Sequence, residues 1–89
     1  MTPLERIRQA FLDHRYTLTE HTYDEMDLDG LDVLDVEAEV LRGPIDLLLI
    51  NDPRGDLYFV FGIESDLTTL IGIVVRFAEN DQLLVITVA

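Results

Sequence analysis

The sequence predicts an α+β domain in which helices come first and a four-stranded antiparallel sheet follows. Apolar residues recur at helical spacing up to residue 42, whereas short β-favouring blocks separated by turn residues follow from residue 45. Gly43-Pro44 marks the change, because glycine commonly follows a helix and proline cannot continue one. A chain of 89 residues buries one core, so we assign residues 1–89 to a single domain.

The first helix is predicted to begin after Thr2, which can cap it, with Pro3 at the first helical position and Glu5 in the capping-box position. Its apolar residues fall on one stripe at helical spacing, formed by Leu4, Ile7 and Phe11. Residues 15–18 then favour a short strand or an extended link.

The second helix is predicted to begin at Thr19 or Thr22 and to end near Gly30, because glycine tolerates the left-handed conformation of a helix end. Asp32 is predicted to cap the third helix, with Asp35 in the capping-box position. Valines at helical spacing give this helix a core-facing stripe, formed by Val33, Val36 and Val40.

Four strands are predicted in the second half, at residues 45–50, 57–63, 70–77 and 83–88. The short turns between them favour antiparallel neighbours. Both faces of the predicted sheet are largely apolar, although the helices can cover only one. The second face therefore meets a partner protein, or else residues 64–69 or the first helix cover it. Both alternatives stay open at this point.

Charge and composition exclude several classes of protein. Eighteen acidic residues against six arginines give a net charge of −12, so a broad cationic surface for nucleic acid is absent. The sequence holds no cysteine, no run of about 18 apolar residues and no recognisable secretory signal. We therefore expect a cytoplasmic protein that has no disulfide, no membrane contact, no cofactor and no metal.

Nine of the acidic residues lie within residues 20–39, where no basic residue occurs. One interpretation is an acidic surface that binds a basic partner or mimics a nucleic acid. The other is adaptation of the whole chain to a salt-rich cytoplasm, where screening reduces self-repulsion and the charge says little about partners.

Two residues are candidates for chemistry. His21 lies at the start of the second helix, and a histidine ring can exchange protons near neutral pH, so it is either a general acid or base or a histidine bonded to a nearby carboxylate or the backbone. Arg76 lies in an otherwise apolar strand, where it lies at a sheet edge, pairs with an acidic residue or contacts a ligand. Residues 25–30 resemble the start of a calcium-binding loop, but Val36 occupies the position that requires a glutamate, which favours a helix-to-helix turn.

Several motifs recur in a fixed order along residues 15–89. They are His21 at a helix start, Met26 five residues later, Gly30-Leu31 before an Asp-Val pair, Gly43 at the next helix end, Tyr58-Phe-Val-Phe-Gly62 in a strand and Ile86-Thr87-Val88 at the close. With these motifs the chain resembles the bacterial family called domain of unknown function 4258.

The resemblance implies a fold related to the RelE, ParE and BrnT toxins, with two to three N-terminal helices packed on a curved antiparallel sheet of four to five strands. It implies a toxin-like component of a type II toxin–antitoxin pair that binds a cognate antitoxin of zinc-finger or helix-turn-helix type. If the protein is an enzyme, the resemblance implies a ribonuclease that cleaves mRNA. His21 is the site residue that it assigns, and Arg76 is added from the strand pattern.

The chain departs from the family at positions that matter for RNA. Glu25 and Asp29 stand where many members carry arginine, and Ala89 replaces a terminal aromatic residue. The loss of two cations disfavours RNA as a partner, since phosphate contacts carry much of the affinity for nucleic acid. The alternative function is a non-catalytic acidic protein-binding module, either an inhibitor or a nucleic-acid mimic. A homodimer is also compatible with the sequence.

Overall fold

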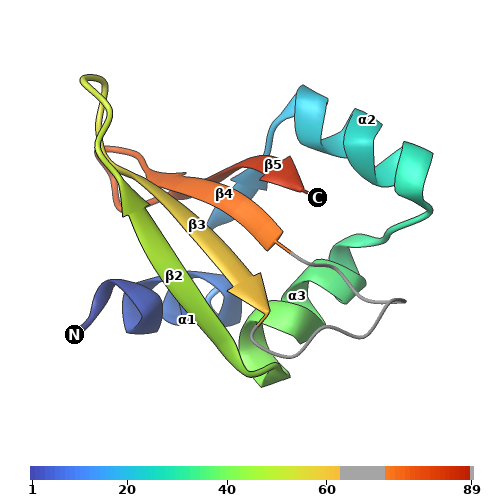
Figure 1. Cartoon of the computed structure of the whole chain (residues 1–89), viewed down its shortest axis with the longest axis horizontal. Coiled ribbons are helices and arrows are strands. Elements are labelled where there is room, and N and C mark those ends of the chain that lie inside the picture. The colour runs from blue at the N-terminus through green and yellow to red at the C-terminus, as the bar shows by residue number, and fades with distance from the viewer. Residues whose placement is uncertain (63–71, 89) are drawn as a thin grey trace.

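The computed structural model describes residues 1–62 and 72–88. Within these residues the chain forms three helices and five strands (Figure 1). In chain order they are α1 (Pro3–Leu12), β1 (Tyr16–Leu18), α2 (Glu20–Asp29), α3 (Val33–Arg42), β2 (Ile45–Ile50), β3 (Leu57–Gly62), β4 (Gly72–Phe77) and β5 (Leu83–Val88). The covering segment predicted at 64–69 and the strand ends predicted at 63 and 70–71 lie outside the described residues. No described helix has the length and apolarity that a membrane crossing requires.

The helices begin at capping residues that the sequence predicts. The Thr2 hydroxyl caps α1, and Thr19 rather than Thr22 caps α2. At α3 the side chains of Asp32 and Asp35 form a complete capping box, in which each accepts a backbone N–H bond. These caps satisfy N–H groups that the first turn of a helix leaves unpaired, which fixes where each helix starts.

The sheet is mixed, which corrects the expectation of an antiparallel sheet. Its strand order is β1-β5-β4-β3-β2. Strands β2 to β5 form the predicted antiparallel meander, whereas β1 pairs with β5 in parallel, with Tyr16 opposite Leu83 and Leu18 opposite Val85. Parallel neighbours need a long connection, and here two helices and three strands separate β1 from β5 along the chain.

Helices α1 and α3 pack on one side of the sheet, which we call the inner face (Figure 1). The buried core between them holds side chains from both layers: Ile7, Ala10 and Phe11 of α1, Val36 and Val40 of α3, and Val60, Ile73, Val75, Leu83, Val85 and Val88 of the sheet. The first helix therefore covers the inner face, and it does not cover the opposite side of the sheet.

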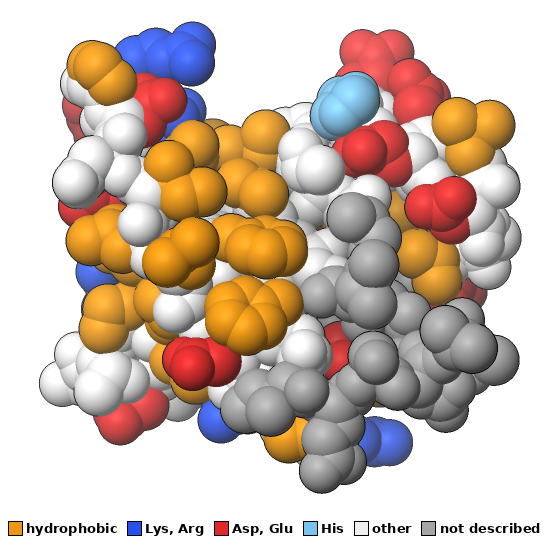
Figure 2. Space-filling view, viewed as in Figure 1, with side chains coloured by type: hydrophobic (Ala, Val, Ile, Leu, Met, Phe, Trp, Pro, Cys, Tyr) orange, Lys and Arg blue, Asp and Glu red, His pale blue; other side chains and the backbone are white. Residues whose placement is uncertain are grey.

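The opposite side of the sheet, which we call the outer face, is largely apolar. The strand registers place on it Leu48, Ile50, Leu57, Phe59, Phe61, Val74 and Leu84, together with the charged residues Asp46 and Arg76. Figure 2 shows apolar side chains gathered over β2, β3 and β4 on this side. The ring of Phe59 lies directly against Gly72 of the neighbouring strand, at a position where a Cβ atom would clash. The glycine thus lets an aromatic ring lie flat on the sheet.

Candidate functional site

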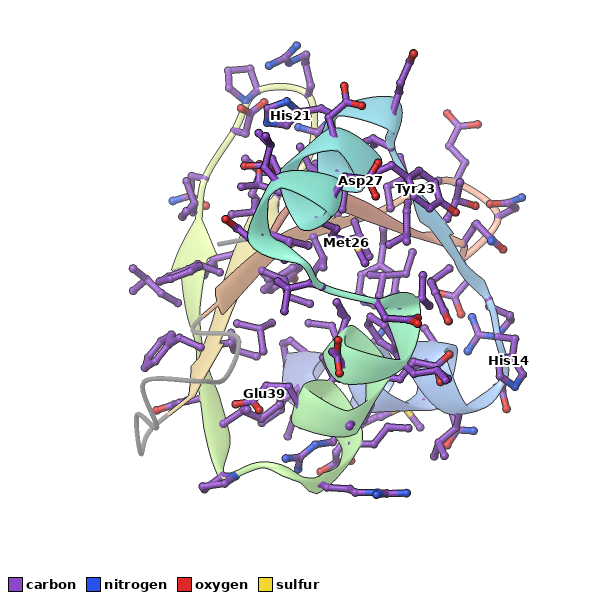
Figure 3. The ribbon with its side chains drawn as sticks, turned by 90° about the vertical axis from the view of Figure 1, so that its right-hand side faces the viewer. His14, His21, Tyr23, Met26, Asp27 and Glu39 are labelled. Atoms are coloured by element: carbon purple, nitrogen blue, oxygen red, sulfur yellow. The ribbon has the colours of Figure 1, made fainter. Side chains whose placement is uncertain are left out.

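His21 lies in the first turn of α2, with its side chain 68% exposed (Figure 3). Its Nε2 atom is 3.3 Å from Oε1 of Glu25, one turn further along the helix. The same Glu25 oxygen accepts a hydrogen bond from the Val88 N–H at 3.2 Å, which ties it to β5. The structure therefore bonds His21 to a carboxylate, as one of the two sequence interpretations predicts.

Arg76 lies on β4 beside the turn that joins β2 to β3. A guanidinium nitrogen is 3.7 Å from Oδ1 of Asp52, so the residue pairs with an acid as one interpretation predicts. The Arg54 N–H bond to this carboxylate lowers the pKa of Asp52, and the charge of Arg76 adds to the effect. The Arg76 Nε atom is buried and has no hydrogen-bond partner among the described residues.

The structure does not join the two predicted catalytic residues. His21 pairs within its own helix, and Arg76 pairs with the β2–β3 turn. Among the described residues, no hydrogen bond or ion pair connects them. A general base and a cation that act on the same phosphate must both contact it. Glu25 holds His21 and Asp52 holds Arg76, so each residue belongs to a different local arrangement.

The calcium-loop resemblance falls on a helix. Residues 25–29 belong to α2, and Gly30 ends that helix with a φ of 67°, in the left-handed region. An EF-hand loop needs a non-helical backbone that turns its ligands toward one point. In the part of the chain that the structure describes, no group of three metal-binding side chains gathers. The predicted helix-to-helix turn is what the structure shows.

A groove that the sequence patterns did not indicate opens beside β1. It has a volume of about 360 Å³ and is lined by His14, Tyr16, Thr17, Leu18, Tyr23 and Val33. These residues come from the α1–β1 turn, from β1, from α2 and from the start of α3. We call this site the β1 groove. Figure 3 shows His14 and Tyr23 on the side of the molecule where β1 and α2 lie.

Tyr16 and His14, which line the β1 groove, belong to a cluster that continues to Glu37 of α3. The Tyr16 hydroxyl donates to Glu37 of α3, and His14 Nδ1 lies 3.7 Å from the same carboxylate. The Tyr16 ring stacks on buried Phe11, with 4.5 Å between ring centroids. Burial first, and then the bond to Glu37, raise the pKa of Tyr16 to about 12. Tyr16 is therefore a neutral donor at physiological pH, and Glu37 is an acceptor held in place.

The backbone of β1 is open toward the groove. Bonds from the Thr19 N–H to Val85 and from the Leu83 N–H to the Arg15 carbonyl show that odd-numbered residues face β5. Alternation along a strand then turns the N–H and C=O groups of Tyr16 and Leu18 the other way. β1 is the edge strand of the sheet, and among the described residues no strand pairs with it on the side away from β5. The groove thus combines an open strand edge with aromatic side chains, and the acidic Glu37 lies behind Tyr16.

Sequence patterns missed the β1 groove because its members are far apart in the chain. Tyr16 and Glu37 are separated by 21 residues and meet only when α3 packs beside β1. His14, with a left-handed φ of 56°, lies between the end of α1 and β1 and turns the chain toward the strand. Comparisons with protein-family models, with curated proteins and with solved structures found no match to this chain.

Proposed function

We propose that this protein is a non-catalytic protein-binding module, whose β1 groove holds an extended segment of a partner protein. The observation that carries the proposal is the unpaired edge of β1 inside a groove of defined side chains. A segment in extended conformation can pair with such an edge through main-chain hydrogen bonds, while neighbouring side chains select its sequence.

Charge favours a basic segment. Glu37 accepts the hydrogen bond of Tyr16, which lines the groove, and residues 20–39 carry nine acids without one arginine or lysine. On α2, Glu20 and Asp27 lie one turn to either side of Tyr23. A lysine or arginine on the segment would gain from this negative field, whereas an acidic side chain would be repelled.

Tyr23 provides a contact surface for such a side chain. It is 51% exposed and reaches the groove from α2. An arginine that lies over a tyrosine ring gains both cation–π attraction and apolar contact. The expected ligand is therefore an extended segment in which a basic residue follows β-favouring neighbours.

The toxin–antitoxin hypothesis gives this partner an identity, namely a cognate antitoxin of zinc-finger or helix-turn-helix type. The separate pairings of His21 and Arg76 support the binding part of that hypothesis over its ribonuclease part. Induced expression in bacteria separates the two. Unchanged growth and intact total RNA are expected for a binding module, whereas growth arrest with RNA cleavage would overturn the non-catalytic proposal.

A library of random dodecapeptides displayed on phage tests the binding function directly. We expect the full chain to enrich β-favouring peptides that contain arginine or lysine. Hydrogen exchange followed by NMR should then show that the Tyr16 and Leu18 amides become protected when an enriched peptide binds. Failure to enrich peptides, or protection elsewhere in the chain, contradicts the proposal.

Two variants with a matched control sharpen this experiment. Tyr23→Ala should weaken peptide binding about tenfold, as is usual for an aromatic contact residue. Leu28→Ala changes a residue of the same helix that is 87% exposed and outside the groove, and should leave binding unchanged. Glu37→Gln keeps an acceptor for Tyr16 but removes the charge, so it should weaken basic peptides more than neutral ones.

A further inference from the structure

The chain has two histidines, and one of them, His14, lines the β1 groove (Figure 3). It lies between the end of α1 and β1, with its side chain 77% exposed. The other, His21, lies on α2 and pairs with Glu25 outside the groove. Histidine is the side chain that ordinarily gains its proton between about pH 5 and 8. A change of binding in this range can therefore be traced to one of two residues.

A carboxylate faces His14 across the end of β1. The Nδ1 atom of His14 lies 3.7 Å from Oε1 of Glu37, and the same oxygen accepts the hydrogen bond of the Tyr16 hydroxyl. The Glu37 side chain is only 18% exposed, so it is held where α3 packs beside β1. A proton on His14 therefore completes an ion pair whose two groups already lie together.

The ionisable groups that face His14 come from each element packed around it. They are Glu37 of α3, Tyr16 of β1, Tyr23 of α2, and Asp13 and Arg15 beside it in the chain. Asp13 and Arg15 pair with each other at 3.3 Å, and Arg15 also pairs with Asp81 of the β4–β5 turn at 3.0 Å. A tyrosine hydroxyl carries no charge below about pH 9. A proton on His14 is thus opposed by Glu37, since the other charges near it are already paired.

Protonation of His14 acts against a basic segment in two ways. The positive ring lies on the lining of the groove, where it repels a lysine or arginine of the segment. Its pairing with Glu37 also cancels part of the negative field that attracts such a residue. The main-chain hydrogen bonds that the β1 edge offers are unchanged, so an uncharged segment loses little.

We propose that protonation of His14 lowers the affinity of the β1 groove for a basic segment, so that the groove holds its partner more weakly as the pH falls from about 7.5 to 5.5. The inference rests on the proposed function, because it concerns the segment that the groove binds. It adds a regulation of that site by pH, with His14 as the group that responds.

Two peptides of the same shape test the proposal on the full chain. One is an enriched peptide that contains arginine, and the other carries uncharged citrulline in place of each arginine. Calorimetry at pH 7.5 and 5.5 in about 20 mM salt, where charges are little screened, measures both dissociation constants. For the arginine peptide the dissociation constant should rise about threefold to fivefold at pH 5.5, as expected for one exposed charge pair. For the citrulline peptide it should change by less than about 1.5-fold.

The outcomes separate this inference from the function on which it rests. If neither peptide binds at pH 7.5, the proposed function fails and the inference fails with it. If the arginine peptide binds equally at both pH values, or the citrulline peptide shows the same change, the inference alone is overturned.

A matched pair of variants identifies the responsible histidine. His14→Asn removes the titrating ring, and asparagine tolerates the left-handed φ of 56° at this position. This variant should bind the arginine peptide equally at both pH values. His21→Asn makes the same change on α2, outside the groove, and should keep the full pH response. A response that persists in His14→Asn, or one that disappears in His21→Asn, overturns the proposal. Circular dichroism at both pH values confirms that each variant is folded.

Discussion

The two edge strands of the sheet lie in different surroundings. β1 has three residues, and its open edge faces a groove lined by tyrosine and histidine side chains, with Glu37 bonded to one of the tyrosines. β2 has six residues, and three successive apolar side chains, Leu48, Leu49 and Ile50, are exposed. Polar side chains beside a strand edge orient a bound segment and select its sequence, whereas apolar surface adds affinity without fixing the orientation of the partner. The β1 edge is therefore surrounded by groups that can orient a bound segment, whereas the β2 edge offers exposed apolar surface.

The largest expected effect is on the free energy of unfolding, and it distinguishes the buried core behind β1 from the exposed edge of β2. Phe11→Ala should destabilise the fold by about 3–5 kcal/mol, because a buried ring disappears from the core. It should also loosen Tyr16, which stacks on that ring. Leu48→Ala at the β2 edge should change stability by less than about 0.5 kcal/mol. Urea unfolding followed by circular dichroism measures both, and equal losses would contradict the contrast between the edges.

An intermediate loss of stability is expected when the hydrogen bond that joins α2 to β5 is removed. Thr22 is fully buried, and its hydroxyl donates to the Val85 carbonyl at 2.8 Å. Thr22→Val should cost about 1–2 kcal/mol, because it leaves a carbonyl without this donor. Thr17→Val, an exposed position on β1, is the matched control and should be nearly neutral. A larger loss in the control would show that β1 itself, not the anchor of α2, limits stability.

The smallest effect is a pH dependence confined to the β1 side. Because the pKa of Tyr16 is raised to about 12, its contribution to stability is complete below its ordinary value near 10 and is lost as pH rises through 12. Tyr16→Phe should remove this slope from the unfolding free energy measured between about pH 10 and 12. Tyr23→Phe, at the exposed wall of the groove, serves as the control. An identical slope in wild type and Tyr16→Phe would contradict the assignment.

Local signals predicted much of the fold. Caps at Thr2, Thr19 and Asp32 act within one turn of a helix, so they can be recognised without knowledge of distant contacts. The strands of the meander were predicted because alternation and turn residues are equally local. The same signals predicted that both faces of the sheet would be apolar.

These local signals could not predict contacts between segments that are far apart in the chain. The three residues of β1 reach β5 across 67 positions, so neither the pairing nor its parallel direction leaves a pattern nearby. The β1 groove has the same origin, because Tyr16, Tyr23 and Val33 come from three elements. Sequence proximity did predict a nearby carboxylate as one possible partner of His21, and the structure provides it in Glu25, one helical turn away.

The shortness of β1 has a consequence for β5. β1 pairs only as far as Val85, so the last residues of β5 have β4 on one side and no strand on the β1 side among the described residues. Side chains of α2 and its cap replace that strand: the Thr19 hydroxyl donates to the Ile86 carbonyl, and Glu25 accepts the Val88 N–H. Exposed edges are templates for aggregation and domain swapping. A carboxylate and a hydroxyl thus protect this end of the sheet from uncontrolled strand addition, and any change that detaches α2 would expose it.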